Sequence, residues 1–322
     1  MATVVPVVHY GLGPIGVEVA RLTATRDHLR SLLAVEIDER LVGRPLEAVT
    51  RMPAHAGVLV GASLPPPPAG TKPVVLHCTG SALECVLPQL LDCVVAGYHV
   101  VSTCEELSHP WRLHPEAATQ LHAAALDHGV AVLGTGVNPG FAMDYLPVTL
   151  TGACQAVDRV DVRRVQDAGR RRLPLQRKVG AGLTVSEFET ARAQGRVGVV
   201  GLTESVWSIA SALGWTLREV TQSLDPVIAT HGLPSGVGEI PAGHVAGVRQ
   251  VARGFDDARE RITLTLEIAV GARELGDEVR ISGVPDLAVT VPGGFPGDLA
   301  TAAVVVNSVA QVAAARPGLL TM

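Results

Sequence analysis

The chain has 322 residues, of which 47% are hydrophobic, 3% aromatic and 18% charged, and its formal net charge is −5. This length suits two domains with a sizeable aliphatic core, and the high apolar fraction excludes a disordered chain. The slightly acidic balance argues against a nucleic-acid partner, because proteins that bind nucleic acid show a basic face.

The first half of the chain alternates short apolar strands with helices. Repeated strand–helix units of this length predict a mostly parallel sheet covered on both faces. The expected elements, in chain order, are a strand at 4–10, a helix from 14, strands at 32–37 and 74–78, a helix at 83–96, a strand at 99–102, a helix at 115–128 and a strand at 130–133.

The pattern changes after Asp144. Residues 156–165 and 261–270 alternate apolar with polar side chains, as half-exposed strands do, and this predicts an antiparallel sheet in a second domain. Residues 297–315 form an Ala/Val-rich helical pattern with little charge. We expect this last helix to be buried and to return to the first domain.

Cysteine usage and the N-terminus indicate a cytoplasmic protein. Five cysteines without a C-x-x-C pair fit neither a disulfide framework nor a zinc-finger spacing, so we expect reduced thiols and no metal site. The N-terminus lacks the basic region of a signal peptide. Charged residues and a proline interrupt the most apolar stretch, 82–101, and we expect no membrane partner.

Residues 11–16 read G-x-G-x-x-G between a predicted strand and a predicted helix. In such a loop the first glycine permits a tight turn, the second lets a pyrophosphate approach the backbone, and the third allows close helix packing. The start of the helix adds free N–H groups and partial positive charge. The residues expected to bind a dinucleotide here are Gly11, Leu12, Gly13, Pro14, Ile15 and Gly16.

An acidic residue about 20 positions further on is expected to bind the adenosine ribose. Glu36 stands there, and Asp38 follows it. An acid at this place favours NAD because it repels the 2′-phosphate of NADP. Arg40 and Arg44 lie close in sequence, however, and the expected cofactor is NAD or NADP.

Polar clusters follow three predicted strands, at 77–81, 102–106 and 134–140. Ligands of open α/β sheets bind beyond the carboxyl ends of the strands, so these clusters should line one crevice. The cofactor contacts expected from them are Thr79, Gly80, Ser81, Ser102, Thr103, Cys104 and Asn138. Ser81 and Ser102 fit the role of a helix N-cap equally well.

Glu105 and Glu106 are the only carboxylates at these three strand ends. Beside a nicotinamide, a glutamate acts as a general base once burial raises its pKa. The alternative for both residues is a structural role in the first turn of a helix, where they would complement the helix dipole.

Several longer motifs resemble the dihydrodipicolinate-reductase-like group that contains 2,4-diaminopentanoate dehydrogenases and native amine dehydrogenases. They lie at 102–107 (STCEEL), 134–144 (GTGVNPGFAMD), 175–183 (LQRKVGAGL), 201–205 (GLTES) and 294–307 (GFPGDLATAAVVVN). Because these motifs span nearly the whole chain, the resemblance is far more specific than the glycine loop alone.

This resemblance implies a Rossmann-type doubly wound parallel sheet plus an inserted α+β domain with a mainly antiparallel sheet. The dinucleotide-binding domain would span 1–144 and be completed by 293–322, and residues 145–292 would form a substrate and dimerisation domain. Members of the group are usually homodimers.

The resemblance also implies reversible oxidative deamination of an amine, with reductive amination by ammonia in the other direction. It puts the catalytic carboxylate on Glu105, with Glu106 in reserve, and adds Asn307 to the cofactor contacts. The substrate pocket would include Asn138, Pro139, Phe141, Met143 and Lys178.

Two departures shape the expected substrate. No His-His pair of a true dihydrodipicolinate reductase is present, and Val199 precedes the Val-Gly-Leu stretch where some diaminopentanoate-type sequences have a histidine. We therefore expect small, largely apolar amines and their carbonyl partners. The alternatives are a 2,4-diaminopentanoate dehydrogenase, whose substrate carboxylate would need Arg171, Arg172 or Arg177, and a non-catalytic dinucleotide sensor.

Overall fold

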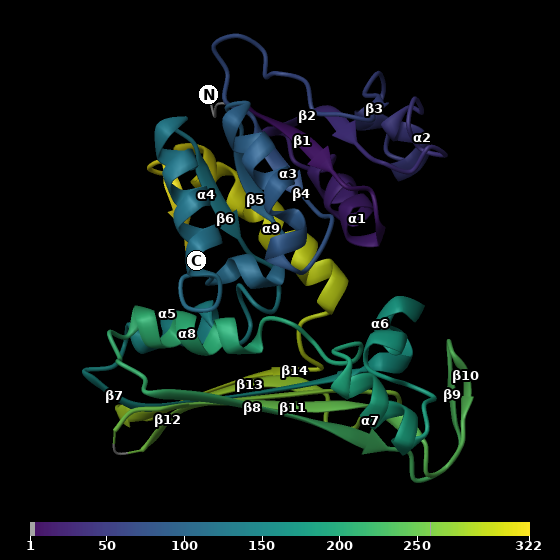
Figure 1. Ribbon diagram of the computed structural model, residues 1–322, viewed down its shortest axis with the longest axis vertical. Coiled ribbons are helices and arrows are strands. Elements are labelled where there is room, and N and C mark those ends of the chain that lie inside the picture. Colours follow the sequence, from purple (N-terminus) through teal and green to yellow (C-terminus); the bar gives the residue numbers. More distant parts are fainter. Residues whose placement is uncertain (1–3, 258) are drawn as a thin grey trace. The chain divides into compact units, whose positions relative to one another are not determined.

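The computed structural model describes residues 4–257 and 259–322, which form two compact units (Figure 1). The first unit runs to Phe141 and takes in Pro296–Met322, and the second unit is Ala142–Phe295. The chain therefore leaves the first unit once and returns to it for its last helix and strand.

The first unit contains a seven-stranded sheet in the order β15-β6-β5-β4-β1-β2-β3, and every neighbouring pair is parallel. This confirms the predicted doubly wound parallel sheet. Its strands are β1 (Val5–Tyr10), β2 (Leu29–Val35), β3 (Val60–Gly61), β4 (Val74–His77), β5 (His99–Ser102), β6 (Ala131–Gly134) and β15 (Gly318–Leu320).

Helices cover both faces of this sheet, because successive side chains of a parallel strand point to opposite sides and both sides are apolar here. Val7 packs in one core cluster with α1 (Pro14–Thr23) and α9 (Gly297–Ala314). Its neighbour Val8 packs in the other, with α3 (Leu83–Val95) and α4 (Pro115–Asp127).

Helix α9 belongs to the first unit, and only one of its faces is buried, whereas the sequence predicted a buried helix. Val305 and Val309 lie in the core, whereas Leu299 and Asn307 are exposed. By length and apolar composition this helix could cross a membrane, but core helices of soluble proteins meet the same two criteria. Helix α9 lies on one face of the sheet with its other side toward solvent, so a single apolar stripe is enough to attach it to the core.

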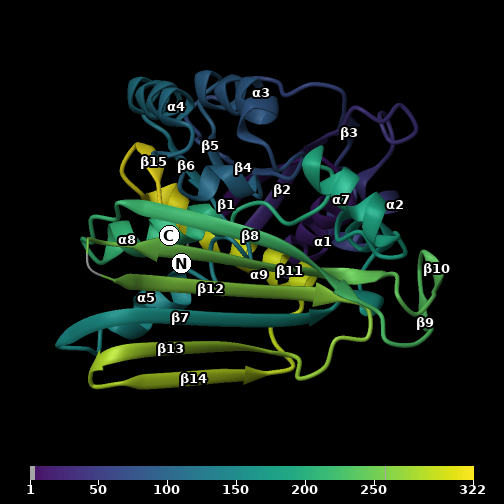
Figure 2. The same ribbon diagram turned by 60° about the horizontal axis from the view of Figure 1, so that its bottom comes forward.

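The second unit is built on a six-stranded sheet in the order β14-β13-β7-β12-β11-β8 (Figure 2). Four neighbouring pairs are antiparallel and β7–β12 is parallel, which confirms a mainly antiparallel sheet. The strands are β7 (Ala156–Asp167), β8 (Glu219–Ile228), β11 (Val245–Phe255), β12 (Glu260–Ala269), β13 (Gly276–Val284) and β14 (Leu287–Pro292), and a separate hairpin is formed by β9 (Leu233–Ser235) and β10 (Gly238–Ile240).

Helices cover one face of this second sheet, where Ile262, Leu264 and Leu266 of β12 are buried. The intervening side chains of β12 face the other, open side. The helices are α5 (Tyr145–Thr151), α6 (Leu173–Lys178), α7 (Val185–Ala193) and α8 (Leu202–Ala212).

Strand β2 departs from its predicted position. It begins at Leu29, which pairs with Val5 of β1, and it ends at Val35. The prediction of 32–37 followed the apolar run, but pairing with β1 sets the ends. Glu36 therefore lies just beyond the strand.

Candidate active site

The glycine loop connects β1 to α1, and each glycine has a different surrounding. Gly11 has a φ of +89°, and a Cβ there would lie 2.6 Å from the carbonyl oxygen of Cys78. A Cβ on Gly16 would lie 1.9 Å from the carbonyl oxygen of Gly11. A Cβ on Gly13 would meet nothing within 4 Å. The outer two glycines thus serve close packing, and Gly13 leaves its side of the loop open.

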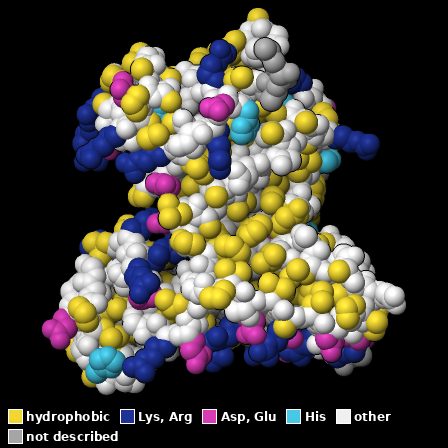
Figure 3. All heavy atoms as spheres, turned by 180° about the vertical axis from the view of Figure 1, so that it is seen from behind, with side chains coloured by type: hydrophobic (Ala, Val, Ile, Leu, Met, Phe, Trp, Pro, Cys, Tyr) yellow, Lys and Arg dark blue, Asp and Glu magenta, His cyan; other side chains and the backbone are white. Residues whose placement is uncertain are grey.

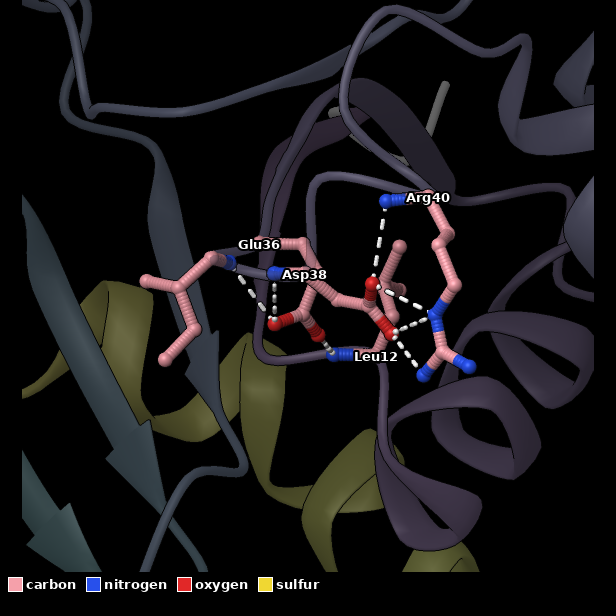
Figure 4. Close-up of polar contacts among 5 residues, drawn as sticks. Leu12, Glu36, Asp38 and Arg40 are labelled. Carbon is pink, nitrogen blue, oxygen red and sulfur yellow. Dashed lines mark hydrogen bonds and ion pairs between the residues drawn. The ribbon is translucent and has the colours of Figure 1, made fainter.

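The carboxylate of Glu36 ties the end of β2 to this loop (Figure 4). Its Oε2 accepts a hydrogen bond from the N–H of Leu12 at 2.6 Å, and its Oε1 accepts from the N–H groups of Ile37 and Asp38 at 2.7 and 3.2 Å. The predicted ribose-binding acid is therefore also a positioning residue for the loop.

Asp38 forms an ion pair with Arg40 beside it (Figure 4). Arg40 Nη2 lies 2.6 Å from Asp38 Oδ2, and Arg40 Nε lies 2.9 Å from Oδ1. Hydrogen bonds from Arg40 lower the pKa of the Asp38 carboxyl to about 2. Asp38 is thus ionised at neutral pH with its charge compensated.

A buried hydrogen-bond chain links the ends of β4 and β5. His77 contacts Gln89 Oε1 through Nε2 and Ser102 Oγ through Nδ1, both at 2.9 Å. Burial lowers the pKa of His77 to about 4, so the ring is neutral, and Gln89 as an acceptor puts its proton on Nε2. Ser102 Oγ in turn accepts from the N–H of Cys104 at 3.1 Å. The chain fixes the backbone just before Glu105.

Of the polar residues predicted here, Ser102 and Cys104 are buried and held within the protein. The thiol of Cys104 donates to the carbonyl oxygen of Ser81 at 3.1 Å, and burial raises its pKa to about 12. Thr79 donates to Gln89 at 2.8 Å, and the N–H of Thr103 donates to the carbonyl oxygen of His77 at 2.9 Å. These two hydrogen bonds position the strand ends. Neither serine caps α3, whose N-cap residue is Ala82.

The two glutamates lie in a 3-10 turn, η2 (Glu105–Ser108), directly after β5. Glu106 Oε2 accepts from the N–H of Leu83 at 2.6 Å, at the start of α3, and lies 3.3 Å from His114 Nε2. Glu106 therefore fills the capping role that no side chain of α3 itself provides. Glu105 is partly exposed.

The end of β6 lies against η2. A Cβ on Gly134 would lie 2.5 Å from the backbone carbon of Leu107, so only glycine allows this approach. Beyond it, Thr135 Oγ1 and Asn138 Oδ1 are buried atoms without a hydrogen-bond partner among the described residues. Thr301 of α9 accepts from the N–H of Val137 at 3.3 Å and holds this loop.

These features fit a bound nicotinamide dinucleotide at the carboxyl edge of the first sheet. The loop is open at Gly13, and no described side chain caps the start of α1. Ile37, beside Glu36, is 86% exposed and offers an apolar surface. Asn138 Oδ1 is an acceptor still lacking a donor, as the carboxamide of a nicotinamide would provide.

Other predicted residues lie elsewhere. Asn307 is not brought to this edge, since its exposed amide lies 3.4 Å from Arg26, which follows the C-terminal end of α1. Met143 and Lys178 belong to the second unit, where Met143 is fully buried. The predicted contacts Pro139 and Phe141 follow Asn138 in the first unit.

Comparison with known proteins places this geometry in a family. The model of the 2,4-diaminopentanoate dehydrogenase C-terminal domain matches residues 141–322. A protein of Acetoanaerobium sticklandii named 2,4-diaminopentanoate dehydrogenase is 34% identical over 332 residues, which cover 99% of this chain and 92% of that protein. The chain belongs to the 2,4-diaminopentanoate dehydrogenase family.

Solved structures share the fold of this family member. An amine dehydrogenase from Mycobacterium smegmatis superposes with a TM-score of 0.83 at 24% identity, covering 98% of this chain and 94% of that one. GenD2 from gentamicin A biosynthesis, in complex with NAD, gives 0.53 at 19% identity, covering 91% and 73%. The resemblance read from the motifs is confirmed, and the chain belongs to a family of dehydrogenases.

Two residues that position this family member's site escaped the sequence prediction. Gln89 lies mid-helix and Thr301 near the far end of the chain, and no local pattern links either to the strand ends. The pairing of Arg40 with Asp38 was accessible, because the two stand two residues apart.

Proposed function

We propose that this chain is an NAD(P)-dependent amine dehydrogenase that interconverts small amines with their ketones or aldehydes, using ammonia as the nitrogen donor in the aminating direction. The observation that carries the proposal is the η2 turn, which holds two glutamates at the carboxyl end of β5, in the same parallel sheet as the open glycine loop. The 34% identical relative supports chemistry at a CH–NH2 group.

Glu105 is the catalytic carboxylate of this proposal. Glu106 is held by the N–H of Leu83 at 2.6 Å and lies beside His114, so its oxygens serve the start of α3. The hydrogen-bond chain through His77 and Ser102 fixes the backbone at Cys104 and so aims the next residue.

A nicotinamide held at this edge of the sheet would supply the hydride to the iminium carbon of the substrate in the aminating direction, or take a hydride up from the amine carbon in the other. In the aminating direction Glu105 takes a proton from ammonium, and ammonia then adds to the carbonyl carbon. Glu105 returns the proton to the carbinolamine hydroxyl, which leaves as water. In the deaminating direction the same carboxylate takes a proton from the water that attacks the iminium carbon.

Small, largely apolar amines are the proposed substrates, because Val199 occupies the place of a histidine found in some diaminopentanoate-type sequences. Gln250 holds this residue in place: its Oε1 accepts from the N–H of Val199 at 2.5 Å, and its Nε2 donates to the carbonyl oxygen at 3.0 Å. The second candidate substrate is 2,4-diaminopentanoate, favoured by the name of the 34% identical relative.

A cytoplasmic homodimer completes the proposal. The five cysteines are free thiols, which suits a reducing compartment.

Basic and acidic side chains line the open face of the second sheet, seen edge-on at the bottom of Figure 3. A hollow of about 520 Å³ on this face is lined by charged side chains that include Asp161, Arg163 and Arg280. Light scattering of the purified protein tests the dimer, and a monomer mass would contradict it.

Turnover assays test the reaction itself. The purified protein is mixed with NADH or NADPH, ammonium and a panel of ketones, aldehydes and oxo-amino acids, and loss of the reduced nicotinamide is followed. Oxidation with simple ketones or aldehydes supports the proposal. Turnover restricted to an oxo-amino acid supports the diaminopentanoate alternative, and tight cofactor binding without any turnover supports a sensor.

A further inference from the structure

A buried hydroxyl in the loop after β6 has no hydrogen-bond partner within the part of the chain that the structure describes. It belongs to Thr135, which is only 3% exposed. We propose that this hydroxyl donates a hydrogen bond to the carbonyl oxygen of the substrate, which makes Thr135 a catalytic residue alongside Glu105. The inference rests on the proposed function, because it concerns a step of the same reaction.

An unpaired buried hydroxyl lowers the stability of a protein, because it has given up its hydrogen bonds with water and gained none. Two other buried threonines of the first unit have the usual arrangement. Thr23 donates to the carbonyl oxygen of Val19 at 2.8 Å. Thr50 donates to the carbonyl oxygen of Leu46 at 3.0 Å. Valine would fill the place of Thr135 without the loss of stability, so the hydroxyl there indicates a partner that arrives with a ligand.

Thr135 lies at the carboxyl edge of the first sheet, where ligands of such sheets bind. Its N–H donates to the carbonyl oxygen of Ser102 at 2.8 Å, and Ser102 ends β5 three residues before Glu105. The preceding Gly134 lies against the backbone of η2. Asn138, whose Oδ1 suits the carboxamide of a nicotinamide, follows on the same loop. The loop therefore ties Thr135 to the turn that carries the proposed base.

The substrates offer this hydroxyl one acceptor. A small apolar ketone or aldehyde has only its carbonyl oxygen, and ammonium has donors only. As ammonia adds, the C–N bond forms and the π electrons of the carbonyl move onto oxygen, where a donor already in place stabilises the developing negative charge. A proton then moves from nitrogen to this oxygen, and Glu105 supplies the second proton with which it leaves as water. Thr135 keeps its own proton throughout.

Stopped-flow kinetics in the deaminating direction test this role, because hydride transfer to the cofactor precedes the entry of oxygen. An amine substrate is mixed with the enzyme and oxidised cofactor, and formation of reduced nicotinamide is followed. Thr135→Val should complete the first hydride transfer at the wild-type rate. Its later turnovers should be about 100-fold slower, since water attack on the iminium lacks the donor. Thr135→Ser keeps the hydroxyl and should retain both rates.

Thermal melts and NADH titrations give readouts that do not depend on turnover. Because its hydroxyl has no bond to lose, Thr135→Val should melt no lower than the wild type and should bind NADH with the same dissociation constant. The matched control is Thr50→Val, at a buried threonine whose hydroxyl is bonded, and it should melt lower while keeping both rates.

The possible outcomes separate this inference from the proposed function. Unchanged turnover in Thr135→Val, or a first hydride transfer slowed as much as the later turnovers, would overturn the inference. Weaker NADH binding would assign the hydroxyl to the cofactor, and a lower melting temperature would assign it to the fold, and either result overturns the inference alone. A wild type that binds NADH but turns over no amine would overturn the proposed function as well.

Discussion

Two neighbouring glutamates in one short turn have different surroundings. Glu106 accepts a hydrogen bond from the first N–H of α3, a donor that would otherwise lack a partner at the helix start. Glu105 precedes it and follows directly on Cys104, whose N–H is fixed by Ser102. Local geometry thus assigns capping to Glu106, and proton transfer by Glu105 is our proposal.

Amide variants separate these roles. Glu105→Gln should lower the amination rate about 100-fold or more, because an amide cannot accept the proton, while NADH affinity is kept. Glu106→Gln still accepts from Leu83, so it should retain most of the rate, and Glu106→Ala should lower stability by about 1 kcal/mol. Steady-state kinetics and thermal melts check this. If Glu106→Gln alone abolished amination, the two assignments would be exchanged.

Buried His77 predicts a loss of stability in acid. Its folded pKa of about 4 lies below the ordinary 6.5, so the unfolded chain binds more protons between these values. Stability present above pH 6.5 is therefore lost as the pH falls toward about 4. In thermal melts across this range His77→Gln should flatten the decline, and exposed His128→Gln should not. Parallel profiles for all three proteins would refute this.

Residue types could be read from the sequence where the chemistry is local. The glycine loop, Glu36 and both glutamates were identified in this way. Hydrogen bonds between distant segments could not be predicted, such as those of Glu106 with Leu83 or of His77 with Gln89. The residues in each of these pairs come close together only after the sheet has formed.

At the scale of elements, the glycines between β1 and α1 have different roles: some allow close packing and another leaves room for a ligand. Gly16 lets α1 approach the carbonyl oxygen of Gly11, and Gly13 faces open space. A side chain at Gly16 therefore disturbs the fold, whereas one at Gly13 reaches only a ligand.

This difference can be measured with two alanine variants. Gly13→Ala should leave the melting temperature unchanged and weaken NADH binding about tenfold or more, since its Cβ points to the pyrophosphate path. Gly16→Ala should destabilise the protein by about 1–3 kcal/mol or more through overpacking. Melts and cofactor titrations on both variants check this. Normal NADH affinity in Gly13→Ala would contradict the assigned binding loop.

A buried ion pair holds the last segment of the second unit. Arg164 and Asp277 lie 2.6 Å apart with side chains 3% and 1% exposed, and they bond the carbonyl oxygen and N–H of Phe295 at 2.8 and 2.7 Å. Asp277→Asn should cost about 3–5 kcal/mol because it leaves a buried charge unpaired. Glu278→Gln, at an exposed pair on the same strand, should cost under about 0.5 kcal/mol. Urea unfolding compares them, and equal costs would contradict the argument.

At the scale of the whole molecule, the sequence predicted both sheets because periodicity reports burial. Continuous apolar runs marked the parallel strands, and alternation marked β7 and β12. The ends of β2 and the exposed face of α9 were predicted less well. Pairing with β1 sets the ends of β2, and the place of α9 on the outside of the sheet decides which of its faces is exposed. The order of strands within each sheet has no signature in periodicity.

An amine dehydrogenase transfers nitrogen from ammonium into its product, and following this nitrogen tests the proposed function most directly. The protein is supplied with NADH or NADPH, a reactive ketone and ¹⁵N-labelled ammonium, and the amine is analysed by mass spectrometry. An amine dehydrogenase must incorporate one labelled nitrogen for each reduced nicotinamide oxidised. Oxidation that yields an alcohol without labelled nitrogen would contradict the account.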